Sequence, residues 1–258
     1  FFMKPKTIRS ISDIQSRSSP SLGKSLAALT LSLYGCAVPV ADPIDGPGSK
    51  TLILNGYEGS SENFPAIGAY VDDGGMDAIC TVSFIRKDLA LTAAHCISPD
   101  GSETNGLGYY DPEYVLHGRN ETFNEYCEEG DPCNKYLHHV VAATRHPKYD
   151  DYADTENHHD FALLLLEREI ADAEPIELLP NTLFEEALAI GDTVTIAGYG
   201  RHYDDYDSFW KITSGKLYAA DVPVTGYHNE AEIIVGERDP TKGNACYGDS
   251  GGPIYVYS

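Results

Sequence analysis

The chain has 258 residues, 42% of them hydrophobic, and a formal net charge of -22 at pH 7. The apolar content argues against an intrinsically disordered protein, and the length allows one large domain or two small ones with a buried core. The acidic charge argues against a nucleic-acid partner, since phosphate groups are bound by basic surfaces, and it also disfavours anionic lipid.

Residues 1–36 have the pattern of a secretory signal. Basic residues, among them Lys4 and Lys24, precede the apolar run "SLAALTLSLYG" at 25–35. This run is shorter than a membrane-spanning helix needs, but it has the length of the hydrophobic region of a signal peptide. We therefore expect a protein that leaves the cytoplasm.

Cys36 follows the apolar run directly, and "LYGC" resembles the lipobox of bacterial lipoproteins, in which the cysteine is lipidated after cleavage. Ordinary secretory cleavage nearby is the main alternative, and an uncleaved anchor or a misread start is the third. The expected location is thus extracellular or, as a lipoprotein, in the cell envelope. A lipid on Cys36 is the only membrane attachment that we expect.

Residues 37–52 are rich in Pro, Gly and Asp and show no period, which is typical of a linker or a pro-segment. From residue 53 onward, short apolar runs with Val, Ile, Thr and Tyr alternate with turn residues. Their spacing favours an antiparallel barrel or sandwich over alternating strands and helices. We expect one all-β region at 53–258, with a bridge between two halves at 171–181.

The chain has six cysteines without zinc-binding spacing, so disulfides are expected outside the cytoplasm. Cys127 and Cys133 are close enough in sequence to close the acidic loop "ETFNEYCEEGDPC" at 121–133. The carboxylates of this loop could bind calcium, but a solvated acidic loop is the simpler interpretation.

Three residues offer the parts of a nucleophilic catalytic site: "LTAAHC" contains His95, "HHDFALLLLE" contains Asp160 and "GDSGGP" contains Ser250. Hydrolysis by serine needs a hydroxyl beside a base, a carboxylate that holds the base in one tautomer, and N–H groups for the developing oxyanion. Glycines beside Ser250 allow the sharp turn that directs N–H groups inward. Taken singly, each motif has another interpretation. A lone histidine such as His95 is more often structural than catalytic, Asp160 could be a turn residue at a strand start, and "GDSGGP" could be a tight turn.

Taken together, the motifs resemble the trypsin/chymotrypsin family of serine proteases (peptidase family S1), from residue 53 to the end of the chain. The resemblance is carried by "ILNG" at 53–56, "LTAAHC" at 91–96, "RHPKYDD" at 145–151, "AGYG" at 197–200 and "ACYGDSGGP" at 245–253. It implies two antiparallel six-stranded β-barrels of the chymotrypsin type. The first would span about 53–170 and the second, incomplete in this chain, about 171–258.

The resemblance also implies roles. His95 would act as general base and then acid, Asp160 would orient it, and Ser250 would attack the peptide carbonyl. The N–H groups of Gly248 and Ser250 would form the oxyanion hole. Polypeptide substrates and protein inhibitors are the expected partners, with no cofactor and no metal. The family's disulfide beside the histidine would join Cys80 to Cys96.

Activation is expected to occur by cleavage before Ile53, whose new amino group would pair with Asp249 and order the oxyanion loop. The chain would therefore be a zymogen. The residue before Ile53 is Leu52, whereas Lys50 lies two residues too early for a trypsin-like activator to cut correctly.

The position six residues before the nucleophile would form the floor of the primary substrate pocket. Asn244 occupies it, with Ala245 and Tyr247 in the same region. Asparagine supplies no negative charge, so the resemblance predicts no strong preference for Arg or Lys.

The family's domain continues well beyond the serine, so we expect this chain to be part of a longer protein. The run "PIYVY" at 253–257 would then be an open strand edge, Cys246 would have no partner in this chain, and the chain itself would be nearly inactive. The alternative is a naturally short, catalytically inactive homologue that acts as a binding or regulatory module.

Overall fold

The computed structural model describes residues 25–27, 53, 56–71, 75–76, 78–97, 113–123, 125–128, 130–150, 159–179, 188–200, 215–228, 232–236 and 243–256. These segments are almost entirely β-structure. The strands are β1 (Ser25–Ala27), β2 (Tyr57–Glu58), β3 (Ile67–Val71), β4 (Ala78–Arg86), β5 (Leu89–Thr92), β6 (Tyr114–His117), β7 (Leu137–Arg145), β8 (Ala162–Leu166), β9 (Glu177–Leu178), β10 (Thr193–Gly198), β11 (Tyr218–His228), β12 (Glu232–Val235) and β13 (Ile254–Val256). Within these described segments, two short 3₁₀ helices accompany them, η2 (Ala94–Cys96) and η3 (Pro132–Tyr136).

Strands β3 to β8 form a closed six-stranded barrel in the order β3-β4-β5-β8-β7-β6, with every neighbouring pair antiparallel. Its strands are rich in aliphatic, β-branched and aromatic residues, which suit a pleated, half-buried surface. Tyr70, Val82, Phe84 and Leu164 are completely buried in it. Closure pairs every backbone edge and gives the site a rigid support.

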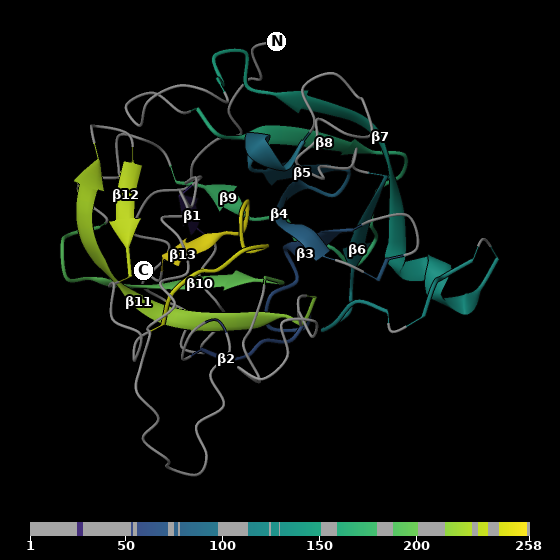
Figure 1. Cartoon of the computed structure of the whole chain (residues 1–258), viewed down its shortest axis with the longest axis horizontal. Coiled ribbons are helices and arrows are strands. Elements are labelled where there is room, and N and C mark those ends of the chain that lie inside the picture. The colour runs from purple at the N-terminus through teal and green to yellow at the C-terminus, as the bar shows by residue number, and fades with distance from the viewer. Residues whose placement is uncertain are drawn as a thin grey trace, which may run out of the picture.

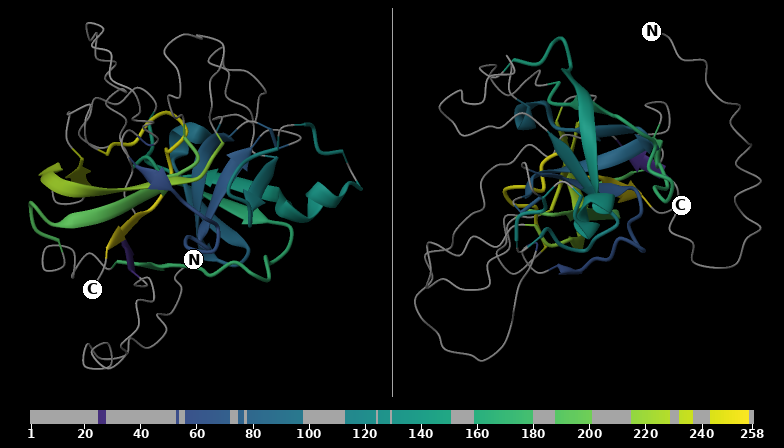
Figure 2. Two further views of the ribbon diagram at one scale, coloured as in Figure 1. Left: turned by 90° about the horizontal axis from the view of Figure 1, so that it is seen from below. Right: turned by 90° about the vertical axis from the view of Figure 1, so that its right-hand side faces the viewer.

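The other strands form an open seven-stranded sheet, in which β12-β11-β10-β13-β1-β9 follow one another and β2 adds to β11. Its centre is the antiparallel pair β10–β11, where Ile196 lies opposite Ala220. Figure 1 shows the two β-structures as adjacent lobes, with β10 to β13 on the left and β3 to β8 on the right. Strand β10 contacts β3 and β4, so the lobes meet along these strands. The left view of Figure 2 shows the same division from below.

An all-β chain with one complete barrel and an unclosed second one agrees with the sequence prediction, but the edge of the second sheet does not. Strand β13 pairs with β10 on one side and with β1 on the other, with Tyr255 opposite Leu26. The predicted open edge at 253–257 is therefore wrong for this structure. An unpaired strand edge exposes backbone hydrogen-bonding groups, and β1 satisfies them.

Strand β1 also pairs with β9 in a parallel orientation, so the second sheet is not wholly antiparallel. This strand is the start of the apolar run at 25–35. The rest of that run and Cys36 lie outside the described residues. No helix in the described segments combines the length and the apolar character that crossing a bilayer requires.

Candidate active site

His95 and Asp160 are brought together by neighbouring strands of the closed barrel. Strands β5 and β8 are antiparallel, with Thr92 opposite Ala162. His95 lies in η2, shortly after the end of β5, and Asp160 lies just before the start of β8. Antiparallel pairing places the end of one strand beside the beginning of the other. The two side chains therefore meet although they are 65 residues apart in the chain.

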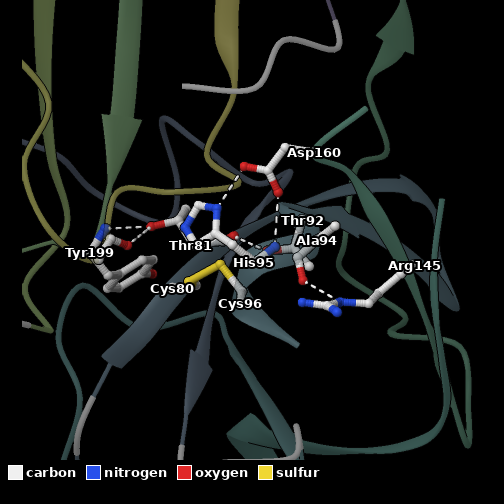
Figure 3. Close-up of a disulfide and its surroundings, with 10 residues drawn as sticks. Cys80, Thr81, Thr92, Ala94, His95, Cys96, Arg145, Asp160 and Tyr199 are labelled. Atoms are coloured by element: carbon white, nitrogen blue, oxygen red, sulfur yellow. Dashed lines mark hydrogen bonds and ion pairs between the residues drawn. A yellow bond between two sulfur atoms is a disulfide. The ribbon is translucent and has the colours of Figure 1, made fainter. Parts of the chain in front are cut away.

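Asp160 contacts His95 at two points (Figure 3). Its Oδ1 accepts a hydrogen bond from the backbone N–H of His95 at 2.8 Å, and its Oδ2 lies 2.6 Å from His95 Nδ1. An ionised carboxylate can only accept hydrogen bonds, so Nδ1 carries the proton and Nε2 is the basic nitrogen. Asp160 is buried and His95 is half-buried, so the base stays accessible while its partner is shielded.

The turn that carries His95 is held from both sides. Arg145 Nε donates a hydrogen bond of 2.9 Å to the carbonyl oxygen of Ala94, and its guanidinium lies over the ring of Tyr149. On the other side, the Cys80–Cys96 disulfide ties the turn to β4, with 6.3 Å between the Cα atoms. In the sequence, Arg145 stands out only as part of a family motif, and its contact with Ala94 is visible only in the structure.

His159 shapes the backbone on the other side of Asp160. Its φ of 37° lies in the left-handed region, which residues other than glycine rarely adopt and in which His is enriched. The N–H of Phe161 donates to the carbonyl oxygen of His159 at 2.8 Å, which closes a three-residue turn around Asp160. The rings of His159 and Phe161 both pack on His146, with centroids 4.6 and 4.5 Å from it. The sequence offered no signal for this packing except that a histidine precedes Asp160.

The loop that carries Ser250 is bound to the closed barrel near His95. The carbonyl oxygen of Ser250 accepts a hydrogen bond of 2.9 Å from the N–H of Thr81 in β4. Gly251 has a φ of 80°, and a Cβ on it would lie 2.7 Å from the nitrogen of Ala93. Only glycine fits such a close approach in this conformation. Ser250 is buried, and its loop thus contacts the segment that leads directly to His95.

Asp249 lies in a space made by the glycines of "AGYG". Its Oδ1 accepts the N–H of Gly200 and its Oδ2 accepts the N–H of Cys246, both at 2.8 Å. A Cβ on Gly198 would lie 2.4 Å from Asp249 Oδ1. Burial raises the pKa of Asp249 from its ordinary 3.8 to about 6, although the two N–H donors act in the opposite direction.

Ile53, the expected ion-pair partner of Asp249, has no free amino group in this chain. Leu52 precedes it, so its nitrogen belongs to a peptide bond and carries no charge. Its side chain is buried in the core of the second sheet, together with residues such as Ile196. In this chain, Asp249 accepts hydrogen bonds from two backbone N–H groups instead.

The expected pocket residues lie on the segment that leads into the loop of Ser250. Asn244 is half-buried, and its Oδ1 accepts a hydrogen bond of 3.0 Å from the N–H of Ala245. Ala245 is buried in the core of the second sheet, whereas Tyr247 is about half exposed, at 51%. Asn244 therefore provides a neutral polar side chain at the position assigned to the pocket floor.

The structure contains both disulfides that were expected from sequence, Cys80–Cys96 and Cys127–Cys133. Cys246 is also disulfide-bonded, so the prediction that it has no partner in this chain is wrong. The fold, rather than sequence spacing, decides which sulfur can approach it. Cys36, with its expected lipidation, lies outside the described residues.

One group of possible metal ligands is found in the described residues, and it consists of Cys80, His95 and Cys96. The disulfide between the two cysteines removes the thiolates that a zinc site would need. In the described part of the loop at 121–133, no three carboxylates approach one another closely enough to hold one ion.

Comparison with known proteins agrees with this geometry. Residues 53–257 match the sequence model of the Trypsin family. The chain belongs to the Trypsin family. Among its relatives, serine protease 7 of Drosophila melanogaster is 29% identical over 230 residues, which are 82% of this chain and 56% of that protein. CLIP domain-containing serine protease B9 of Anopheles gambiae is 29% identical over 189 residues, 68% of this chain and 45% of that protein.

This Trypsin-family chain thus spans about half the length of these two curated relatives. Neuropsin, a serine protease expressed in the limbic system of mouse brain, has a similar solved structure. The TM-score is 0.54 at 20% sequence identity, covering 78% of this chain and 81% of neuropsin. At this identity the likeness concerns the fold alone, and it agrees with the predicted chymotrypsin-type architecture.

Proposed function

We propose that the protein is a secreted serine endopeptidase that hydrolyses peptide bonds through His95, Asp160 and Ser250. The observation that carries this proposal is the two-point contact of Asp160 with His95, because it leaves Nε2 of the histidine as a base. The contacts of the Ser250 loop with Thr81 and with Ala93, two residues before His95, support the same proposal.

In the proposed reaction, Ser250 Oγ attacks the carbonyl carbon of the scissile peptide and His95 Nε2 takes the hydroxyl proton. The resulting oxyanion accepts hydrogen bonds from the N–H groups of Gly248 and Ser250. His95 then gives its proton to the leaving amine, and an acyl-enzyme remains. His95 then takes a proton from water, which attacks the acyl carbon. As the ester bond breaks, His95 returns this proton to Ser250 Oγ and the carboxylic acid product leaves. Asp160 stays ionised and stabilises the imidazolium that forms in each step.

We further propose that activation requires cleavage before Ile53. The new ammonium group would pair with Asp249, which is buried and holds only partial positive charges from N–H groups in the uncleaved chain. A buried carboxylate gains most from a full positive charge in a site that excludes water. The disulfides are consistent with maturation in an oxidising, secretory compartment.

The neutral side chain of Asn244 favours substrates whose residue before the cleaved bond is uncharged. Since a charged guanidinium or ammonium group would find no carboxylate there, Arg and Lys would be bound weakly. Polypeptides are the proposed substrates, and protein inhibitors would compete with them for the same substrate-binding site.

The proposal is tested on the full natural protein, activated at Ile53 and treated with a fluorophosphonate probe that reacts with activated serines. We expect labelling of Ser250 and hydrolysis of a peptide library, and neither in a Ser250→Ala variant. A folded, cleaved wild type that shows neither reaction would instead support a non-catalytic binding or regulatory module.

A further inference from the structure

Thr81 is a completely buried polar residue in β4 whose hydrogen-bonding groups are all used. Its hydroxyl donates to the carbonyl oxygen of Gly248 at 2.8 Å and accepts the N–H of Tyr199 at 3.0 Å. Its backbone N–H donates to the carbonyl oxygen of Ser250 at 2.9 Å. Its own carbonyl oxygen accepts the hydroxyl of Thr92 at 2.9 Å. Figure 3 shows Thr81 between the Cys80–Cys96 disulfide and Tyr199.

These bonds join three parts of the molecule. Thr81 belongs to the closed barrel and Tyr199 directly follows β10 of the open sheet. Gly248 and Ser250 belong to the segment that leads into β13. The two residues whose N–H groups form the proposed oxyanion hole are therefore both tied, through their carbonyl oxygens, to Thr81. A serine protease needs these N–H groups in fixed directions, because they act by preorganisation.

We propose that Thr81 is a positioning residue that fixes the oxyanion hole, an inference that rests on the proposed function. Gly248 has a φ of 93°, and glycine peptides rotate more easily than others. The hydroxyl of Thr81 opposes such rotation because it holds the carbonyl oxygen of Gly248. Without the hydroxyl, this oxygen and the N–H of Tyr199 both lose their partner in a buried place, which favours rearrangement of the loop.

Two substitutions at this position separate the hydroxyl from the shape of the side chain. Thr81→Val keeps the branched shape and removes the hydroxyl, whereas Thr81→Ser keeps the hydroxyl. Thr195→Val is the matched control. Thr195 is also completely buried in a strand, but it belongs to the second sheet. Its hydroxyl donates to Asp221 Oδ1 at 2.5 Å.

In the activated full-length protein we expect Thr81→Val to lower kcat about 10- to 100-fold with KM within about twofold, since the hole is misplaced and substrate contacts are kept. Inhibition by a peptidyl trifluoromethyl ketone, which forms a hemiketal oxyanion on serine, should weaken by the same factor. Thr81→Ser and Thr195→Val should stay close to wild type. Unchanged kcat in Thr81→Val, or equal losses in Thr81→Val and Thr81→Ser, would overturn the proposal.

Hydrogen exchange gives a readout that does not depend on catalysis. The N–H of Asp249 donates to the carbonyl oxygen of Cys246 at 3.1 Å, and the N–H of Gly252 donates to that of Asp249 at 2.9 Å. We expect both to exchange at least about tenfold faster in Thr81→Val, with no change in Thr195→Val. An inactive wild type would contradict the proposed function. Equal exchange of these two N–H groups in wild type and Thr81→Val would refute the positioning role of Thr81, whether or not the wild type is active.

Discussion

Gly200 lies so close to Asp249 that no other residue fits in its place. A Cβ on Gly200 would be 2.5 Å from Asp249 Cγ and 2.6 Å from the backbone nitrogen of Asp249. The same glycine donates its N–H to the carboxylate of Asp249. Gly200 is thus both the neighbour that leaves room for Asp249 and one of the donors that hold it.

We therefore expect Gly200→Ala to displace the loop that carries Ser250. Backbone atoms of Asp249 would have to move, which should lower the free energy of unfolding by about 1–3 kcal/mol and lower kcat at the same time. Urea denaturation and peptide hydrolysis measure the two effects. Gly191→Ala is the control, because Gly191 has a φ of 97° and open space around it. It should cost stability through backbone strain, about 1–2 kcal/mol, without loss of activity.

Asp160→Asn should abolish most of the activity while leaving the fold intact. The amide of asparagine can donate a hydrogen bond to Nδ1 of His95. It therefore favours the tautomer in which Nε2 carries the proton and cannot act as a base, which should lower kcat about 10³- to 10⁴-fold at neutral pH. Steady-state hydrolysis by the activated protein measures this loss. Asp172→Asn is the control, since the side chain of Asp172 is 79% exposed and faces His117 rather than His95. Full activity in Asp160→Asn would exclude Asp160 from the catalytic set.

The uncleaved chain should become less stable between about pH 4 and pH 6 because of Asp249. Its pKa is raised from 3.8 to about 6 in the folded state. The folded state therefore binds the proton more tightly, and this stabilisation is fully present below the unfolded pKa and is lost as the pH rises through the folded one. The difference in pKa corresponds to about 3 kcal/mol. Urea denaturation from pH 4 to 7, compared with Asp249→Asn, measures it.

Cleavage before Ile53 should change the way in which the stability of the protein depends on pH. A new ammonium group beside Asp249 would favour the ionised carboxylate, so the decline in stability between about pH 4 and pH 6 should disappear. An identical pH profile before and after cleavage would contradict the proposed ion pair.

Asn244→Asp should shift the preference of the activated enzyme toward Arg and Lys. A carboxylate at the pocket floor adds a charge-assisted contact, which should raise kcat/KM for these residues about 10- to 100-fold. Profiling with a peptide library measures the shift. Asn244→Ala is the control and should show no gain for basic residues. The same profile in Asn244→Asp as in wild type would place the specificity determinant elsewhere.

Much of the fold could be predicted because its signals are local. Short apolar runs between turn residues are enough to indicate strands, and close cysteine spacing made the Cys127–Cys133 disulfide plausible. The motifs around His95, Asp160 and Ser250 agree in order with one family. The match of residues 53–257 to the Trypsin family model confirms that the chain belongs to this family. Glycines that allow close approach, such as Gly198 and Gly251, carry a signal in the sequence because no other residue can replace them.

The remaining features depend on contacts between distant segments. The sequence marks Thr81 only as a β-branched strand residue, and its link to Gly248 arises because the two lobes meet at β4. The pairing of β1 with β13 and β9 was not predicted, since strand pairing depends on which backbone edges come together in space. The same holds for the disulfide of Cys246. Residue types and their order decided the chemistry that is available, whereas only the tertiary structure decided which groups meet, because hydrogen bonds and disulfides form only within a few ångströms.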